Sequence, residues 1–327
     1  MKIGTVDFGN RPVFLAPMEE ISDAPFRRLC KRFDADMVYT EFIASEALRR
    51  DVEKSKRKME FDEMERPIGI QIFGNEEQAM VEAALVAQTA NPDVIDINWG
   101  CPVRKVASKG SGSGILNNIP KMIAITKAVV NSVNIPVTVK TRLGYDNSDK
   151  PIVDIALRLQ DIGIAALTIH GRTRPQMYMG EADWTLIGEV KNNPNIHIPI
   201  IGNGDITSPE IAKKRFEETG VDAIMVGRAA TGNPWIFREI KHYLNTGELL
   251  SRPTLLERAN ICTEHLLTSI EWKGERAGIV EMRRQYSHYF SGLYGFKPFK
   301  LKLLTSYSLS EILEMIELIK ENYREME

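Results

Sequence analysis

A cysteine that follows a short apolar run is the first candidate for chemistry in this chain. The run from Val94 to Ile97 leads into Asn98-Trp99-Gly100-Cys101-Pro102, and a basic, then glycine-rich stretch follows. This pattern is typical of a buried strand that presents a thiol at the mouth of a site. Most free cysteines are small buried core residues, so a structural role for Cys101 stays open on spacing alone. A core cysteine, however, usually lies inside an apolar run and not in a Gly-Cys-Pro turn.

Two basic side chains end other apolar runs. Lys140 closes Val137-Thr-Val-Lys140, and because an ammonium in apolar surroundings is costly, it should meet an anion or a polar ligand atom. It could contact a cofactor or act as a Schiff-base nucleophile, and the structural alternative is a lysine that reaches solvent. His170 precedes Gly171 and could bind a ligand or serve as an acid or base, and the nearby Arg172 and Arg174 favour an anionic ligand. A hydrogen-bonded structural histidine is the alternative there.

Two glycine turns indicate a phosphate site. Gly202-Asn203-Gly204-Asp205 follows one apolar run, and Gly227-Arg228 follows the next. Loops after strands seven and eight of a parallel barrel commonly bind phosphate, because backbone N–H groups and a helix N-terminus converge there. A pair of tight structural turns is the alternative. The Gly110-Ser-Gly-Ser-Gly114 segment follows no strand, and we interpret it as a mobile loop. We predict no metal site, since CxxC and HExxH motifs are absent.

The elements that position these groups alternate along the chain. Apolar runs predict strands at Val13–Ala16, Met37–Thr40, Ile68–Phe73, Val94–Ile97, Val137–Lys140, Ala166–Ile169, Ile198–Ile201 and Ala223–Val226. Amphipathic patterns predict helices at 24–33, 77–90, 119–132, 152–162, 184–192 and 208–219, and the charged stretch 46–58 could also be helical. Strands that each lead into a crossover predict an α/β fold, a (β/α)8 TIM barrel. An open doubly wound sheet is the alternative, but its usual early GxGxxG motif is absent.

The parity of the polar residues supports the barrel. Alternate positions of four strands carry polar groups, namely Gln71, Asp96, Asn98, Thr138, Lys140, Thr168 and His170, whereas isoleucine and valine fill the other positions. Because barrel strands alternate inward and outward side chains, we predict that the polar set faces the interior. It gathers toward the carboxyl ends of the strands, where barrel active sites lie.

After residue 250 the pattern becomes helical only. Arg252-Pro253 interrupts the chain, and Leu255, Ala259, Cys262 and Leu266 then recur at the spacing of one helix face. We therefore predict a barrel domain over residues 1–247 and a small all-helical C-terminal bundle over residues 248–327.

Composition narrows the class of protein. The 327 residues carry a formal net charge of −2, so an RNA partner would need local basic patches. No apolar run approaches the ~18 residues of a membrane span, and the N-terminus lacks a signal-peptide core. The 3 cysteines are far apart, which fits a reducing compartment. We expect a cytoplasmic protein without a membrane partner, and no protein partner is indicated.

Several ordered motifs together resemble the tRNA-dihydrouridine synthase family. They are Leu15-Ala-Pro-Met18, Ser22-Asp-Ala-Pro-Phe-Arg27, Asp96-Ile-Asn-Trp-Gly-Cys-Pro102, Lys140-Thr-Arg142, Ile169-His-Gly-Arg-Thr173, Gly202-Asn-Gly-Asp-Ile206 and Val226-Gly-Arg-Ala-Ala230. Gly232-Asn-Pro-Trp-Ile-Phe-Arg238 is similar to the bacterial B-type branch in particular. The match runs from residue 3 to about 247 and continues more weakly into the helical tail.

The resemblance implies a barrel that holds FMN, is reduced by NADPH or NADH, and saturates the C5–C6 bond of selected uridines in tRNA. It implies that Cys101 protonates C5 while the flavin delivers hydride to C6, and that the tail binds tRNA. The cofactor-binding residues implied are Pro17, Met18 and Glu19 at the flavin ring, Gln71 and Lys140 at its polar edge, His170 as a further neighbour of the flavin, and Asn203, Gly204, Asp205, Gly227 and Arg228 at its phosphate. A proton donor must be a neutral thiol, so the pKa of Cys101 should not be strongly lowered.

The chain departs from the family pattern at three places. Glu19-Glu20 stands where small residues are common, Trp99 where Met or Leu is common, and Arg104 in place of a frequent lysine. Three rival functions stay open: a flavin barrel that acts on a free small substrate such as a dihydropyrimidine, a flavin-free lyase that uses Lys140 as a Schiff base, and a tRNA-binding protein with an inactive site.

Overall fold

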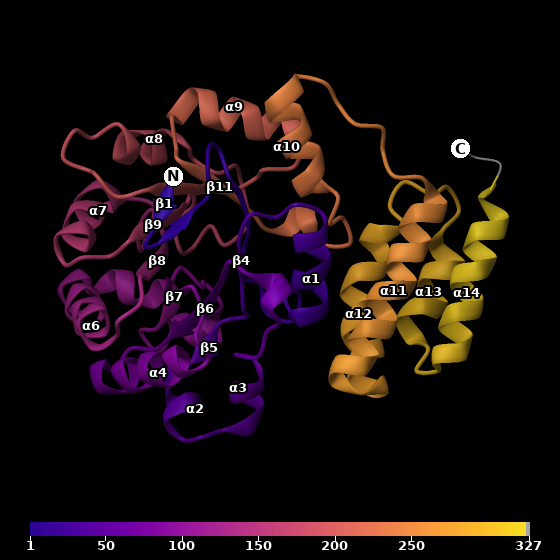
Figure 1. Cartoon of the computed structure of the whole chain (residues 1–327), viewed down its shortest axis with the longest axis horizontal. Coiled ribbons are helices and arrows are strands. Elements are labelled where there is room, and N and C mark those ends of the chain that lie inside the picture. Colours follow the sequence, from indigo (N-terminus) through magenta and orange to yellow (C-terminus); the bar gives the residue numbers. More distant parts are fainter. Residues whose placement is uncertain (325–327) are drawn as a thin grey trace.

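A barrel of parallel strands occupies the larger part of the molecule (Figure 1). The structure is a computed structural model, and it describes residues 1–324. The barrel strands in this described part are β3 (Val13–Leu15), β4 (Val38–Tyr39), β6 (Ile68–Phe73), β7 (Val94–Trp99), β8 (Val137–Arg142), β9 (Ala166–His170), β10 (Ile200–Asn203) and β11 (Ala223–Val226). Their order is β3-β11-β10-β9-β8-β7-β6-β4, and a parallel bridge between Phe14 and Met37 brings the two ends of the sheet together. The predicted (β/α)8 barrel is thereby confirmed.

Helices cover the outside of the barrel, as the amphipathic patterns predict. Those of the barrel part are α1 (Ala24–Arg32), α2 (Ser45–Arg49), α3 (Glu53–Arg57), α4 (Glu77–Thr89), α5 (Arg104–Ala107), α6 (Ile119–Ser132), α7 (Ile152–Asp161), α8 (Thr185–Lys191), α9 (Pro209–Thr219) and α10 (Ile236–Thr246). Short 3-10 helices are η1 (Glu63–Glu65), η2 (Gly112–Asn117) and η3 (Arg228–Ala230). The side chains of Asn118 and Ser208 accept hydrogen bonds from the first turns of α6 and α9, because such polar residues satisfy N–H groups that a helix leaves unpaired.

The barrel interior has an apolar layer at one end and a polar layer at the other. The apolar layer contains buried Phe14, Met37, Val94, Ala166, Ile201, Ala223 and Met225. The hairpin of β1 (Lys2–Ile3) and β2 (Val6–Asp7) lies at this end, and Ile3 packs against the layer.

The polar layer lies nearer the carboxyl ends of the strands. Gln71 donates to Asp96 at 2.5 Å, Thr138 donates to Asp96 at 2.6 Å, and Asn98 donates to Gln71 at 2.8 Å. These bonds satisfy polar groups that would be costly to bury alone. The predicted inward orientation of the polar parity is therefore confirmed for these strands.

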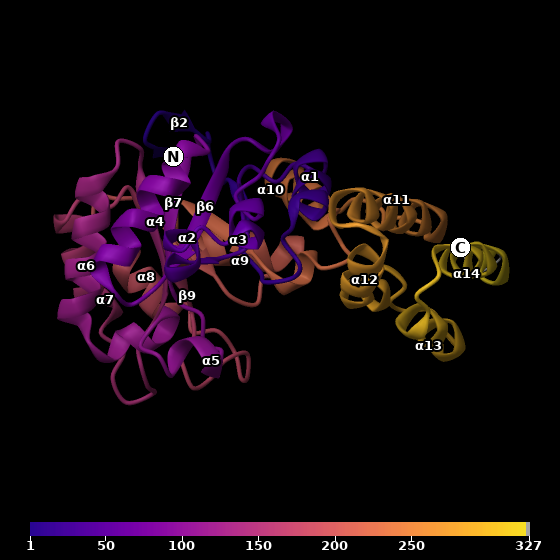
Figure 2. The same cartoon turned by 90° about the horizontal axis from the view of Figure 1, so that it is seen from below.

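Four helices beyond the barrel form the C-terminal bundle, namely α11 (Leu255–Lys273), α12 (Glu275–Tyr289), α13 (Lys297–Thr305) and α14 (Leu309–Asn322). In both views α11 and α12 lie on the side of the bundle that faces α1 and α10, and α13 and α14 lie farther from the barrel (Figures 1 and 2). Their hydrophobic cluster is distinct from that of the barrel, but Phe33 and Trp235 of the barrel side contribute to it. Within residues 1–324, no helix is long and apolar enough to cross a membrane.

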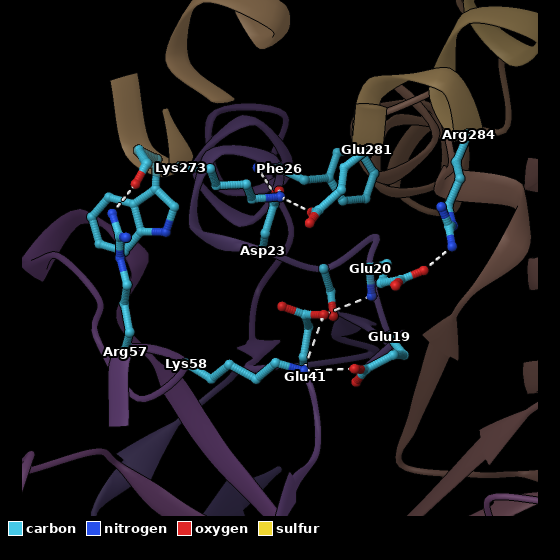
Figure 3. Close-up of polar contacts among 12 residues, drawn as sticks. Glu19, Glu20, Asp23, Phe26, Glu41, Arg57, Lys58, Lys273, Glu281 and Arg284 are labelled. Carbon is cyan, nitrogen blue, oxygen red and sulfur yellow. Dashed lines mark hydrogen bonds and ion pairs between the residues drawn. The ribbon is translucent and has the colours of Figure 1, made fainter. Parts of the chain in front are cut away.

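The barrel and the C-terminal bundle are joined by polar as well as apolar contacts. The rings of Phe26 in α1 and His265 in α11 stack with centroids 5.5 Å apart. Lys273, at the end of α11, bonds both Asp23 and Glu281, and Arg57 donates to the carbonyl of Trp272 (Figure 3). These contacts hold α11 and α12 next to the loop that follows β3.

Candidate active site

A cavity of about 700 Å³ opens at the carboxyl ends of the barrel strands. Its lining comes from the carboxyl-terminal residues of β7 to β11, from the loops after β3, β7, β9, β10 and β11, and from Phe42 after β4. This is the end of a parallel barrel at which ligands bind, because the loops there vary while the strands hold them rigidly. Of the residues predicted for the site, those that line it are Pro17, Met18, Glu19, Cys101, Lys140, His170, Asn203, Gly204, Asp205, Gly227 and Arg228.

Cys101 is fixed just beyond the end of β7. The Oδ1 atom of Asn98 accepts hydrogen bonds from the backbone N–H of Gly100 at 3.0 Å and of Cys101 at 2.9 Å. The carbonyl of Cys101 accepts from the N–H of Ser113 at 3.0 Å and from its hydroxyl at 2.9 Å. The residue is 8% exposed, and burial raises the pKa of its thiol above the ordinary value. The thiol is therefore neutral at pH 7, as expected for a proton donor.

The segment that supports Cys101 differs from our interpretation. We interpreted the Gly110–Gly114 stretch as a mobile loop, but residues 112–117 form η2 and their small residues are buried. A Cβ on Gly112 would lie 2.8 Å from the carbonyl oxygen of Cys101, so the glycine permits close packing under the cysteine turn. The glycines of this stretch therefore indicate that two backbone segments pack closely together, and not that the loop is mobile.

Three basic side chains face the cavity from β8 and β9. Burial lowers the pKa of Lys140 to about 8 and that of Arg142 to about 10. Burial and the neighbouring cations, Arg142 and Lys140 foremost, hold the pKa of His170 well below its usual value, so its imidazole is neutral at pH 7. The ammonium of Lys140 has no hydrogen bond or ion pair within residues 1–324. A half-buried, unpartnered ammonium that faces a cavity is suited to hydrogen-bond acceptors of a ligand.

Arg142 and Tyr178 line the cavity although neither was predicted as a site residue. The guanidinium of Arg142 donates to the carbonyls of Gly100, Thr173 and Met177, and it lies 5.8 Å from the centre of the Tyr178 ring. Arg142 shares the inward parity of Lys140, which was a usable signal. Tyr178 lies in the long connection between β9 and α8, where no periodicity indicates a direction.

The two glycine turns predicted to bind phosphate follow β10 and β11 and also line the cavity. The carboxylate of Asp205 accepts from Arg172 at 2.7 and 3.0 Å and from Arg228 at 2.9 Å. Burial alone would raise the pKa of Asp205, but these arginines and the N–H of Ala182 lower it overall. Gly204 has a φ of +129°, and a Cβ there would lie 2.7 Å from the Cβ of Ala182. Asp205 therefore orients two arginines instead of presenting a free carboxylate.

Gln71 lies beneath the cavity and does not line it. Its side chain is fully buried, with its amide engaged by Asp96 and Asn98. Asn98 does line the cavity, so the hydrogen bond between Gln71 and Asn98 connects the polar layer to the cavity floor. Burial raises the pKa of Asp96 to about 6, although the hydrogen bonds from Gln71 and Thr138 act to lower it.

The three departures from the family pattern have different structural roles. Trp99 points outward to α6, where its indole N–H donates to Thr126 at 3.0 Å. Arg104 is exposed on α5. Glu19 lies at the cavity rim, 2.7 Å from the ammonium of Lys58, and Glu20 pairs with Arg284 of α12 (Figure 3).

A second, largely buried carboxyl group lies beside Glu20 and Lys58. Glu41 accepts from the N–H of Glu20 at 2.6 Å, and its Oε1 lies 3.5 Å from the Lys58 ammonium. Burial raises the pKa of Glu41 to about 7, and the charge of Lys58 lowers it only in part. The added acid near the site is thus largely paired with cations of the barrel and of the helical bundle (Figure 3).

A parallel barrel with a buried thiol and a cationic cavity at its carboxyl end belongs to the class of (β/α)8 barrel enzymes. Solved structures agree on the fold. The chain aligns with an old yellow enzyme homologue from Zymomonas mobilis at a TM-score of 0.52 and 14% identity, covering 79% of this chain and 94% of that one. It aligns with a 2-naphthoyl-CoA reductase at a TM-score of 0.59 and 12% identity, covering 74% of this chain but 51% of that one.

Sequence comparison identifies the family. The family model described as dihydrouridine synthase matches residues 14–323. The tRNA-dihydrouridine synthase B of Pseudomonas aeruginosa is 41% identical over 92% of this chain and 90% of its own. That of Vibrio parahaemolyticus is 42% identical over 88% of this chain and 89% of its own. The chain belongs to the dihydrouridine synthase family, which confirms the family and the enzyme class predicted from its motifs.

Proposed function

We propose that this chain reduces the C5–C6 bond of uridines in tRNA, with Cys101 as the proton donor. The observation that carries the proposal is a neutral, buried thiol that lines the same cavity as a half-buried, unpartnered ammonium. The proposed reaction is that of the dihydrouridine synthase family, and relatives at about 40% identity are named tRNA-dihydrouridine synthase B. Substrate, cofactor and residue roles are proposals for this chain.

The residues of the cavity fit FMN. Its volume of about 700 Å³ lies within the ~300–1,000 Å³ range of ligand sites. Arg228, with the backbone of Gly204 and Gly227, would hold the phosphate, while Asp205 keeps Arg172 and Arg228 in place. Lys140 and His170 would meet acceptor atoms of the ring, and Pro17, Met18 and Glu19 would border it. Gln71 would act through Asn98 without touching the cofactor.

Bound FMN, reduced by NADPH or NADH, would supply hydride to C6 of the uracil ring. Cys101 would then give its proton to C5, and solvent would restore the thiol. Asn98 is the positioning residue for this step, because its amide oxygen binds the N–H groups of Gly100 and Cys101. One terminal nitrogen of Arg142 has no hydrogen-bond partner within residues 1–324, and it is suited to a carbonyl oxygen of the base.

A tRNA substrate also accounts for the helical bundle. We propose that residues 248–327 bind tRNA and that the uridine leaves its stack to enter the barrel. Exposed basic residues on this part, such as Arg276, Lys300 and Lys302, are suited to backbone phosphates. We also propose a cytoplasmic location, in line with the family's tRNA substrate.

The test is anaerobic reoxidation of the flavin. The purified protein is loaded with FMN and reduced with one equivalent of NADPH, and flavin absorbance is followed after mixing with unmodified tRNA, with free uridine or with buffer. Rapid reoxidation by tRNA, but not by free uridine or buffer, supports the proposal. Equal or faster reoxidation by free uridine would instead favour a flavin enzyme that acts on a free small substrate. Failure of the protein to bind flavin would favour the flavin-free lyase that uses Lys140 as a Schiff base.

A further inference from the structure

A second cavity of about 730 Å³ adjoins the active-site cavity. The two share Glu19, Phe42 and Val103 as lining residues, so one ends where the other begins. The second cavity lies between the α2–α3 segment, the end of β6, and α5 with the loop after it. None of the residues that we assign to the flavin or to proton transfer, apart from Glu19 at the shared rim, lines it.

The charge of this second cavity is unbalanced. Lys54, Lys105 and Lys109 line it, and within residues 1–324 their ammonium groups have no ion pair. Its two carboxylates are already engaged, because Glu46 lies 3.2 Å from Arg50 and Glu19 lies 2.7 Å from Lys58. The cavity therefore presents three uncompensated positive charges from α3, α5 and the turn after α5, a setting that favours an anion.

An aromatic surface accompanies the charge. Phe42 and Phe73 both line the cavity, with ring centroids 5.3 Å apart at an interplanar angle of 80°. Phe73 is partly exposed at the end of β6. Polar groups complete the wall, including Ser45, Ser111 and Asn75. Cations beside an accessible aromatic ring are the combination that binds a nucleotide, whose phosphate is anionic and whose base stacks.

We propose that the second cavity binds the nucleotide next to the target uridine. This inference rests on the proposed function, since it requires an RNA substrate. A uridine extruded into the barrel stays covalently linked to its neighbours, so an adjacent phosphate must lie near the shared rim. Lys54, Lys105 and Lys109 would contact the backbone on either side of that nucleotide, and its base would stack on Phe73. The cavity would thereby contribute to the choice of uridine as well as to affinity.

The test measures tRNA binding and flavin reduction separately. Lys54 and Lys109 are replaced together (Lys54→Ala with Lys109→Ala), and the matched control is Lys127→Ala, an exposed lysine on the outer helix α6 that also has no ion pair within residues 1–324. A third variant, Phe73→Leu, keeps apolar volume but removes the aromatic face. Affinity for unmodified tRNA is measured by fluorescence anisotropy over a range of salt, and reduction of the bound flavin by NADPH is measured without tRNA.

We expect the double lysine variant to bind tRNA more weakly and to lower the slope of log affinity against log salt by about 1.4, since each single-strand phosphate contact contributes about 0.7. Phe73→Leu should weaken binding about 5-fold or more with an unchanged slope, because stacking is not ionic. The control should match the wild type, and all variants should be reduced by NADPH at the wild-type rate.

Two results would overturn the assignment. Wild-type tRNA affinity and slope in the lysine and Phe73 variants would exclude a nucleotide subsite. Slower reduction by NADPH with unchanged tRNA binding would assign the cavity to the reductant. Failure of the proposed function is distinguishable from both, because the wild-type protein itself would then neither bind tRNA nor be reoxidised by it.

Discussion

Replacing Asp205 with asparagine should destabilise the protein out of proportion to the exposure of the side chain. Asp205 accepts two hydrogen bonds from Arg172 and one from Arg228, and Arg172 is 1% exposed. Asp205→Asn keeps the shape of the side chain but leaves a buried guanidinium without a counter-charge. Breaking a buried pair costs about 3–5 kcal/mol, and the 27% exposure of Asp205 places the loss near the lower end, at about 3 kcal/mol.

Asp222→Asn is the matched control. Asp222 is 26% exposed and pairs with Lys191 at 2.7 Å, but Lys191 is itself 27% exposed and can be rehydrated when the charge is removed. We expect a loss of about 1 kcal/mol there, within the range of partly exposed pairs. Urea unfolding followed by circular dichroism at pH 7 measures both losses. Equal losses, within about 0.5 kcal/mol, would refute the claim that Asp205 compensates a buried arginine.

The pH dependence provides a second check on Asp205. Its pKa in the folded state is lowered, so its contribution to stability is fully present above the ordinary carboxyl pKa of about 3.9 and is lost as the pH falls through the lowered value. The gap between wild type and Asp205→Asn should therefore be the same at pH 7 and pH 5 and should narrow only below about pH 4. A gap that closes between pH 7 and pH 5 would contradict the lowered pKa.

Two further predictions concern the cavity and its rim. Arg228→Ala should weaken FMN binding about 10-fold or more, since a hydrogen bond to a charged group is worth ~1.5–3 kcal/mol, and fluorescence titration measures the affinity. The control is Arg238→Ala, whose side chain is 47% exposed against 54% for Arg228 and lies outside the cavity, and this variant should bind FMN normally. Glu41 has a pKa raised by burial to about 7, so it destabilises the fold as the pH rises from about 4.5 to 7. Glu41→Gln should therefore gain up to ~3 kcal/mol relative to wild type between pH 5 and pH 8 in urea unfolding, and a pH-independent difference would reject the raised pKa.

The sequence predicts the barrel well because each strand carries a strong apolar signal on its outward parity. It underestimates the length of β7 and β8, which continue to Trp99 and Arg142. The reason is physical: the inward residues near the carboxyl ends are polar, so apolarity stops before the hydrogen-bonded ladder does. The same polar residues, Asn98 and Lys140 among them, are those that line the cavity.

Other features could not be predicted from local patterns. The charged stretch 46–58 forms two short helices, α2 and α3, because the chain turns at Asp51 with a φ of 59°. Tyr178 reaches the cavity from a long connection without periodicity, and the second cavity depends on segments far apart in sequence. The engagement of Asp205 by two arginines also required the structure, because a motif match cannot distinguish a ligand contact from the residue that orients it.

The most direct measurement of the central claim is dihydrouridine formation in unmodified tRNA by the wild-type protein and by Cys101→Ala, each with FMN and NADPH, read by mass and mapped by position. We predict new dihydrouridine at defined positions with the wild type, and a loss of most of it with Cys101→Ala while flavin and tRNA binding are retained. Full turnover by Cys101→Ala would contradict the role of the thiol as proton donor. A folded, flavin-bound wild-type protein that makes no dihydrouridine would contradict the proposed function itself.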